Sequence, residues 1–392
     1  MSGPTMKPLR VTGYSMLSAL GATRAEHLDA LSNGRTGLGP APMPLPFDTA
    51  VGQVRAELPE LPAELASRST RIAQMAMHLV NGLEEPLRKA RERYRPERIG
   101  ILLGTSTAGA EMTERAYKSF VEDGSFPAGY DFQKQHTFGA LLHVVAALTG
   151  ATGPAWMAST ACTSSGKTFA SASRLIEAGI IDCAIVGGLD TLCRLTLMGF
   201  QSLQALDTRI CRPFHPERGG INIGEGGALA LVERDGDARV LVSGVGESSD
   251  AFHISAPHPE GRGARDAMQR SMEIAGCQPE DIDHINAHGT GTSLNDIAES
   301  RAILSLLPPE VPVISTKGFT GHTLGAAAAI EFCFSAIAIE EGWIPPSLGA
   351  TPVDPEITLN VPGSVTRGNF QRVISNSFAF GGNNVSLLVQ AP

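Results

Sequence analysis

The chain has 392 residues, 42% of them hydrophobic and 18% charged, a balance typical of a globular protein with a sizeable core. Its net charge of −9 argues against a nucleic-acid-binding protein, because neutralising phosphates requires an excess of Lys and Arg. Residues 1–10 lack the apolar segment of a secretory signal, and no long apolar run predicts a transmembrane helix. We therefore expect a cytoplasmic protein without a membrane span.

The six cysteines are scattered and form no C-x-x-C pair; they are Cys162, Cys183, Cys193, Cys211, Cys277 and Cys333. Such spacing in a large chain is typical of reduced thiols rather than of a disulfide framework. It also makes a zinc site improbable, so we expect no metal.

Strand-like and helix-like segments alternate along the chain. In the first part, apolar runs predict strands at 98–104, 183–188 and 229–233, and composition predicts a helix at 164–178. The later strands are predicted at 240–245, 282–287, 311–315, 373–377 and 385–389. The later helices are predicted at 264–275, 295–306 and 324–341. This alternation favours parallel sheets covered by helices.

A charged segment at 233–239 divides the chain into two parts with the same rhythm. We predict two α/β halves of similar design, an N-terminal half of residues 1–235 and a C-terminal half of residues 236–392. No low-complexity run suggests separately tethered modules.

Cys162 lies in a run of small residues, 159–166, that leads directly into the predicted helix. A helix N-terminus offers free N–H groups and a positive dipole end, which would lower the pKa of the cysteine and favour a thiolate nucleophile. A lone buried cysteine is nevertheless more often structural. The motifs found elsewhere in the sequence must therefore decide whether Cys162 is structural or catalytic.

Two histidines occupy similar turns in the second half. His288 follows a predicted strand and enters the loop Gly-Thr-Gly-Thr, and His322 follows Thr-Gly and precedes an Ala-rich helix. One such histidine is more often a structural residue than a catalyst. Two of them, each at a strand-to-helix turn, favour an active site.

A glycine-containing loop at 375–384 joins two apolar runs. Glycines permit positive φ and let backbone N–H groups face a ligand, so the loop could supply an oxyanion donor. It could equally be a hairpin turn, and both interpretations can hold together.

Six motifs resemble those of the β-ketoacyl-[acyl-carrier-protein] synthase I/II family, in the thiolase superfamily. In family order they are Val11-Thr12-Gly13, Thr160-Ala161-Cys162-Thr163, Arg212-Pro213-Phe214, the His288 loop, the His322 turn and the Ser377-Phe378 loop. The resemblance spans essentially the whole chain. It implies an α/β fold of duplicated thiolase-like halves, arranged in five layers, αβαβα.

The resemblance also implies a reaction, in which Cys162 holds an acyl chain and condenses it with a malonyl thioester after decarboxylation. His288 and His322 would donate hydrogen bonds to the forming enolate, with Lys317 in an electrostatic role beside Glu331. The backbone N–H groups of Cys162 and Phe380 would form the oxyanion hole.

Further roles follow only from the resemblance. Phe380 would act as a gate, with Phe378 beside it. Thr290, Thr292 and Ser255 would bind the pantetheine arm. His253 would lie behind the residues that contact the substrate. Arg68, Arg71 and Arg212 would dock the carrier protein.

The implied partners are an acyl carrier protein and acyl and malonyl thioesters. No cofactor is expected, because the phosphopantetheine arm arrives on the carrier. A dimer is expected, either of identical chains or with a paralogue resembling a chain-length factor.

Related activities fit less well. A thiolase needs a second cysteine near the C-terminus, whereas Cys333, the last cysteine, lies in an apolar helix. A coenzyme-A-dependent synthase would have Asn at position 322, where this chain has His. A chain-length factor would lack Cys162. Departures from the family pattern, such as Ala379 and Asn383 in the gate loop, suggest a divergent branch such as a secondary-metabolite ketosynthase. The alternative is therefore the catalytic subunit of a heterodimer, and Thr107 leaves the acyl length open.

Overall fold

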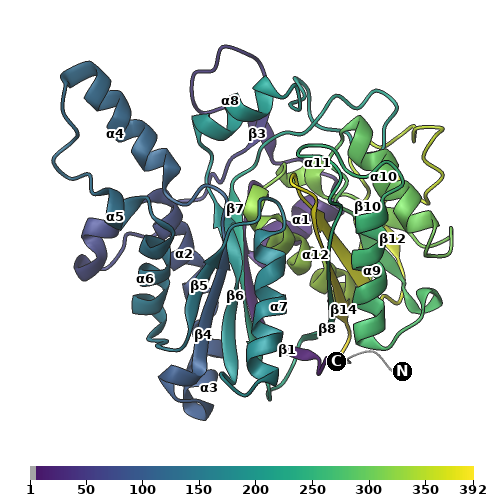
Figure 1. Ribbon diagram of the computed structural model, residues 1–392, viewed down its shortest axis with the longest axis horizontal. Coiled ribbons are helices and arrows are strands. Elements are labelled where there is room, and N and C mark those ends of the chain that lie inside the picture. The colour runs from purple at the N-terminus through teal and green to yellow at the C-terminus, as the bar shows by residue number, and fades with distance from the viewer. Residues whose placement is uncertain (1–5) are drawn as a thin grey trace.

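Within residues 6–392, which the computed structural model describes, ten strands form one sheet in the order β10-β9-β13-β14-β8-β1-β7-β6-β4-β5 (Figure 1). The first five in the chain are β1 (Leu9–Leu17), β4 (Ile99–Gly104), β5 (Ala155–Ala158), β6 (Cys183–Asp190) and β7 (Gly226–Glu233). The next five are β8 (Val240–Ser249), β9 (His284–Asn286), β10 (Val313–Ile314), β13 (Arg372–Phe378) and β14 (Asn383–Gln390). Short β2 (Leu38–Pro40) pairs with β3 (Ala50–Gly52), and β11 (Trp343–Ile344) with β12 (Thr366–Arg367).

The two sets of five strands repeat one arrangement. In each, the third strand lies at the edge, followed by the second, fourth, fifth and first strands of that set. The second strand pairs in parallel with the third and fourth, while the fifth pairs antiparallel with the fourth and first. A short antiparallel pairing of β1 with β8 joins the sets. The expected duplication is therefore confirmed.

The sheet is mixed, and the prediction of parallel sheets is wrong for five of its nine pairings. Strands such as β6 and β7 are buried along their whole length, the pattern typical of parallel strands. Their direction, however, is set by the connection, and β7 runs antiparallel to β6. Burial on both faces arises here because helices cover both sides of a mixed sheet.

Helices form three layers around the two halves of the sheet (Figure 1). Helices α2 (Arg71–Asn81) and α6 (Phe138–Thr149) cover the outer face of the first half, sharing a core with β4. Between the halves lie α7 (Ser164–Glu177) and α12 (Ala327–Glu341), whose Phe169 and Phe332 rings pack 4.9 Å apart. Helices α9 (Arg262–Ala275) and α10 (Ser293–Leu304) cover the second half. This gives the expected αβαβα layers.

Other elements decorate this framework. They are α1 (Arg24–Ser32), α3 (Glu84–Arg93), α4 (Ala110–Asp123), α5 (Phe132–Gln135), α8 (Arg194–Ser202), α11 (Lys317–Thr320) and the 3-10 turns η1 (Ala63–Arg68), η2 (Pro96–Arg98), η3 (Pro279–Asp281) and η4 (Leu324–Ala326). The helix predicted at 324–341 is thus a 3-10 turn followed by α12. Across residues 6–392 no helix combines the length and apolarity needed to cross a membrane.

The predicted boundary at residues 235 and 236 falls in the connection between β7 and β8, which end and begin at Glu233 and Val240. Its position stays a prediction.

Candidate active site

Cys162 lies on a sharp turn between β5 and α7. The preceding Ala161 has φ of 51°, in the left-handed region that a non-glycine residue rarely adopts, so the chain reverses abruptly just before the thiol. The turn is held by the Thr160 and Ala161 carbonyls, which accept hydrogen bonds from the backbone N–H groups of Thr163 and Ser164. The cysteine is consequently fixed one residue before the N-cap of α7, Thr163.

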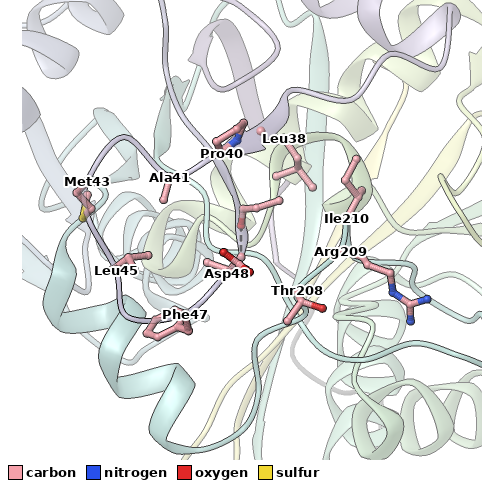
Figure 2. A pocket seen from close by; sticks show the side chains of 13 residues that line it. Leu38, Pro40, Ala41, Met43, Leu45, Phe47, Asp48, Thr208, Arg209 and Ile210 are labelled. Atoms are coloured by element: carbon pink, nitrogen blue, oxygen red, sulfur yellow. Dashed lines mark hydrogen bonds between the residues drawn. The ribbon is translucent and has the colours of Figure 1, made fainter.

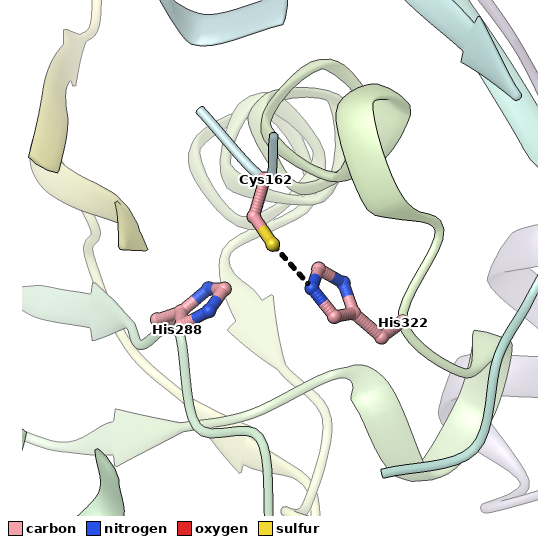
Figure 3. A group of neighbouring side chains, drawn as sticks. All are labelled: Cys162, His288 and His322. Atoms are coloured by element: carbon pink, nitrogen blue, oxygen red, sulfur yellow. Dashed lines mark hydrogen bonds between the residues drawn. The ribbon is translucent and has the colours of Figure 1, made fainter. Parts of the chain in front are cut away.

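The structure brings both histidines of the second half to this thiol (Figure 3). His322 Nε2 lies 2.9 Å from Cys162 Sγ, and one donor atom from each of Cys162, His288 and His322 lies within 4.8 Å of the others. The two imidazole rings are 5.3 Å apart and nearly perpendicular, at 83°. His322 is therefore placed to take the thiol proton, and His288 to donate to a substrate beside the sulfur.

All three groups are buried, and burial sets their protonation. Burial, reinforced by the nearby Lys317 ammonium, lowers the pKa of His288 and of His322 well below the usual value, so both imidazoles are neutral near pH 7. Burial also raises the pKa of Cys162 to about 12, although Lys317 opposes this. The expectation of a lowered cysteine pKa is therefore wrong for the resting site, because desolvation outweighs the helix N-terminus. The thiol must lose its proton to His322 as it attacks.

Lys317 and Glu331 form a buried ion pair beneath the histidines, as expected. Lys317 Nζ donates to Glu331 Oε1 at 2.6 Å, and their side chains are only 1% and 5% exposed. Burial raises the pKa of Glu331 to about 7, while Lys317 lowers it. The Lys317 ammonium places a positive charge near the site where a substrate oxygen becomes negative.

Cys162, His288 and His322 also form a donor set that a transition metal could use. Two observations favour catalysis over a resident metal. In metal sites the second imidazole nitrogen usually donates to a carboxylate or carbonyl, whereas Nδ1 of each histidine has no partner among the described residues. The buried Lys317 charge would also repel a divalent cation.

The three residues line a cavity of about 440 Å³. Its walls include the residues assigned to the pantetheine arm and the gate, namely Thr290, Thr292, Ser255, Phe378 and Phe380. His253 also lines this cavity and is exposed, so it lies in the wall itself rather than behind it as predicted. The reason is that the 250–258 loop lies at the surface, where the His253 Nδ1 accepts only from the Ser255 N–H and hydroxyl.

The loop after β13 lines the cavity at Cys162, and its oxyanion role stays a prediction. Among the described residues no other residue accepts from the backbone N–H of Cys162 or of Phe380. Gly381 and Gly382 have φ of 83° and 75°, conformations suited to glycine. The Gly381 N–H donates to the Ile254 carbonyl at 2.8 Å, which ties this loop to the cavity wall. Phe380, 41% exposed, packs with its ring 5.8 Å from that of Phe200.

The three arginines assigned to carrier docking differ in their surroundings. Arg71 is turned inward: its guanidinium contacts the buried Glu225 carboxylate at 2.5–3.1 Å. This buried carboxylate holds the Arg71 guanidinium, whose assignment to carrier docking stays a prediction. Arg212 is 20% exposed and donates to the Glu217 carbonyl at 2.5 Å. Half-buried Arg68 forms no ion pair within residues 6–392.

A second cavity, of about 530 Å³, lies under the proline-rich loop between β2 and β3 (Figure 2). Apolar side chains such as Met43, Leu45 and Phe47 line it, with Asp48 and Arg209 as its charged groups. Its lining contains neither cysteine nor histidine. The chemistry described above therefore belongs to the cavity at Cys162.

Comparison with known sequences agrees with this geometry. The family described as "Beta-ketoacyl synthase, N-terminal domain" matches residues 6–238, and the corresponding "C-terminal domain" matches residues 240–351. The chain belongs to the β-ketoacyl synthase family.

Among the family's curated members, "3-oxoacyl-[acyl-carrier-protein] synthase 2" of Staphylococcus aureus is 34% identical over 309 residues, covering 74% of this chain and 77% of that protein. "Nodulation protein E" of Rhizobium meliloti (strain 1021) is 32% identical, covering 96% of this chain and 97% of that protein. Among solved structures of similar fold, the ketosynthase ApeO with its chain length factor ApeC, from Xenorhabdus doucetiae, matches with a TM-score of 0.91. Sequence identity is 36%, with 98% of each chain covered.

Three residues that sequence reasoning missed also shape this site. Glu299 of α10 accepts from the backbone N–H groups of His288 and Gly289, both at 2.8 Å, and so fixes the histidine loop. Asp190 holds the loop after β4, and its Oδ1 binds the Thr107 hydroxyl at 2.7 Å. Phe200 lines the cavity. The sequence signal for Asp190 was a carboxylate at the end of an apolar run, whereas the polar neighbours of Glu299 gave no such signal.

Proposed function

We propose that this protein forms a carbon–carbon bond by decarboxylative condensation of a malonyl-[acyl-carrier-protein] with an acyl chain held on Cys162. The product is a 3-oxoacyl-[acyl-carrier-protein], made in fatty-acid or related polyene or polyketide biosynthesis. The observation that carries this proposal is the 2.9 Å contact between Cys162 Sγ and His322 Nε2, with His288 beside both.

In the first step, Cys162 Sγ attacks the carbonyl of an acyl thioester while His322 accepts the thiol proton. The oxyanion points to the N–H groups of Cys162 and Phe380, which have no other acceptor among the described residues. The carrier thiolate leaves with that proton, and the acyl chain stays on sulfur. Burial suits this step, since a neutral thiol–imidazole pair costs less to desolvate than an ion pair.

In the second step, neutral His288 and His322 each donate an N–H to the thioester oxygen of the malonyl group. For His322 this requires the tautomer with the proton on Nε2, whereas in the first step the proton is on Nδ1. As carbon dioxide leaves, the electron pair of the broken bond forms an enolate, whose negative oxygen these donors stabilise. The enolate carbon then attacks the acyl carbonyl, and the Cys162 thiolate departs. A proton taken up from solvent restores the resting thiol. The Lys317 ammonium, held by Glu331, favours negative charge throughout.

No resident cofactor enters this scheme, because the reactive thioester arrives on the carrier's phosphopantetheine arm. Thr290 and Thr292 offer hydroxyls along the cavity, their Oγ1 atoms 2.9 Å apart, and Ser255 lies on its wall. We assign these three residues to the amide groups of that arm. We also place the protein in the cytoplasm, where its six free thiols would stay reduced.

A second chain is part of the proposal. Strand β5 forms one edge of the sheet, and Trp156 on it is 37% exposed. Beyond this edge, α4 projects from the body (Figure 1). It carries the exposed rings of Tyr117 and Phe120, and Phe120 stacks with exposed Phe126 in the segment that follows the helix. An open edge with exposed aromatic groups favours association with another chain.

The resemblance to ApeO, solved with its chain length factor, favours a second candidate: the catalytic subunit of a heterodimer with such a paralogue. Light scattering of the purified chain, alone and co-expressed with a candidate paralogue, would distinguish the two. A stable, active homodimer alone would contradict the heterodimer.

The test of the chemistry is acyl loading followed by intact mass measurement. Wild type should gain the mass of one acyl group, and Cys162→Ala should gain none. Cys183→Ala, which removes a buried thiol at the start of β6, is the matched control and should load normally. Acyl-enzyme on the Cys162→Ala variant would refute the proposal.

A further inference from the structure

Asp190, the last residue of β6, carries a fully buried carboxylate that the proposed mechanism does not use. Its Oδ1 accepts hydrogen bonds from the Thr105 hydroxyl at 2.8 Å, the Ser106 N–H at 2.8 Å, and the Thr107 N–H and hydroxyl at 2.7 Å each. No Lys or Arg within residues 6–392 forms an ion pair with Asp190. The carboxylate is thus committed to one loop, residues 105–107.

This loop contacts the turn that carries the nucleophile. The Ser106 hydroxyl donates to the Ala161 carbonyl at 3.4 Å, and Ala161 is the residue whose left-handed conformation precedes Cys162. Displacing residues 105–107 would therefore release one constraint on the position of the thiol.

The same carboxylate also touches the turn that follows His322. Gly325, in η4, approaches so closely that a Cβ on it would lie 2.8 Å from Asp190 Oδ2, 2.8 Å from the Ser106 nitrogen and 2.9 Å from the Thr105 carbonyl carbon. Only a glycine allows this approach, and it begins three residues after the base. The carboxylate, the loop and the His322 turn are therefore in direct packing contact.

We infer that Asp190 is a positioning residue, which holds the 105–107 loop between the Cys162 turn and the His322 turn and thereby fixes the 2.9 Å contact between thiol and imidazole. A correctly spaced nucleophile and base matter because a displacement of about 1 Å can cost about a hundredfold in rate. The inference rests on Cys162 being the nucleophile of the proposed function.

The position and the charge of Asp190 have separable effects. Burial is the main cause that raises the pKa of Cys162; Lys317 lowers it, and the Asp190 carboxylate raises it further. The other ionisable groups facing the thiol are His288, His322 and Glu331. Removing the charge should shift thiol ionisation to lower pH, and removing the acceptor should displace the thiol.

The experiment compares Asp190→Asn, Asp190→Ala and Glu233→Ala. Asn keeps an oxygen at the Oδ1 position but no charge, whereas Ala removes the acceptor. Glu233, equally buried, lies opposite Cys183 at the far end of the β6–β7 pair and binds Thr12 and Arg93. It is the matched control for loss of a buried carboxylate.

Two rates are measured: acylation of Cys162 at saturating donor, by intact mass, and alkylation of Cys162 by iodoacetamide across pH. We expect Asp190→Ala to lower the acylation rate at least about tenfold without a matching rise in KM, and Asp190→Asn to stay within about threefold of wild type. Both should move the alkylation midpoint to lower pH. Glu233→Ala should change neither quantity.

The inference is overturned if Asp190→Ala acylates at the wild-type rate, if Asp190→Asn is as slow as Asp190→Ala, or if Glu233→Ala is equally slow. If wild type itself takes no acyl group, the proposed function fails, while the alkylation rates still test Asp190. Asp190→Asn and Asp190→Ala both lack the charge and only Ala lacks the acceptor, so equal alkylation rates of these two variants across pH would then overturn the inference.

If Asp190→Ala does not fold, the double variant Thr105→Val, Thr107→Val removes two donors to Asp190 while preserving side-chain volume. It should lower the acylation rate about threefold or more. Wild-type acylation by the folded double variant would overturn the inference.

Discussion

The two halves of the sheet share one strand order, yet equivalent loops carry different chemistry. The turn before the central helix holds Cys162 in the first half and His322 in the second. The loop after the second strand is the 105–107 loop in one half and the His288 loop in the other. Duplication supplied two similar sets of turns, and the reaction uses their difference, a nucleophile from one half and two imidazoles from the other.

Each half nevertheless holds its second loop in the same way. Asp190 accepts from the N–H groups of Ser106 and Thr107, as Glu299 does from those of His288 and Gly289. In both cases a buried carboxylate binds two successive backbone donors. The common requirement is a fixed loop, because buried N–H groups without acceptors would be costly.

The ends of the fourth strands differ most. In the first half this strand ends at Asp190, which is buried and saturated with hydrogen bonds. In the second it ends at Phe378 and leads into a loop with exposed Phe380 and two glycines at positive φ. The first half therefore ends this strand in a buried support for the nucleophile turn, and the second ends it in a surface loop for which gating is our prediction.

The largest expected effect concerns the two histidines. His322→Ala should lower both acylation and malonyl decarboxylation by about 10²- to 10³-fold, since it removes the base and a donor. His288→Ala should lower decarboxylation by a similar factor but spare acyl loading. Carbon dioxide release and intact mass measure the two steps.

His78→Ala is the control for the histidine variants, because His78 binds the Ala22 carbonyl in the first half, outside the cavity lining. Normal carbon dioxide release from His288→Ala or His322→Ala would remove that residue from the scheme.

Lys317→Met should be the most destabilising change in the second half. It leaves Glu331 buried without its cation, at a cost of about 3 kcal/mol in the free energy of unfolding. Urea unfolding measures this cost. The double variant Lys317→Met, Glu331→Met should recover much of it, and failure to recover would mean that the pair stabilises by more than mutual neutralisation.

The same Lys317→Met variant should change the pH dependence of decarboxylation. In wild type, burial and Lys317 hold the pKa of both catalytic histidines well below 6.5, so activity should persist as pH falls through 6.5. Without the ammonium both pKa values rise, so activity should be lost at a higher pH. If the midpoint of the pH profile were unchanged, Lys317 would not control the pKa of the two histidines.

Substituting Arg71 and Arg68 compares an arginine that is paired with a buried carboxylate with one that has no ion pair among the described residues. Arg71→Ala should cost about 2 kcal/mol in stability, because Glu225 stays buried, whereas Arg68→Ala should cost less than about 0.5 kcal/mol. Thermal unfolding distinguishes them. Equal stability of both variants would contradict the inward orientation of Arg71.

The smallest expected effect is in the gate loop. Ala379→Gly should lower stability by about 0.5–1 kcal/mol by increasing the freedom of the unfolded chain. If Ala379 stiffens the loop, this variant should also speed the transfer from acyl loading to condensation in single-turnover measurements. An unchanged transfer rate would mean that the loop's mobility does not depend on this position.

The sequence by itself determined the nucleophile turn, the two histidine turns and the two α/β halves of similar design. Small residues around Cys162 and glycines beside His288 and His322 encode local backbone geometry, and alternating apolar runs encode the elements that position it. These signals lie within a few residues of the groups they describe.

Only the tertiary structure decided which groups are paired or desolvated. Arg71 is held by Glu225, 154 positions away, and the pKa of Cys162 rises because distant segments exclude water from it. Asp190 is hydrogen-bonded to a loop that lies more than 80 positions earlier in the chain. Strand direction likewise depended on the connections. Burial and pairing are properties of segments brought together by folding, so no local pattern could encode them.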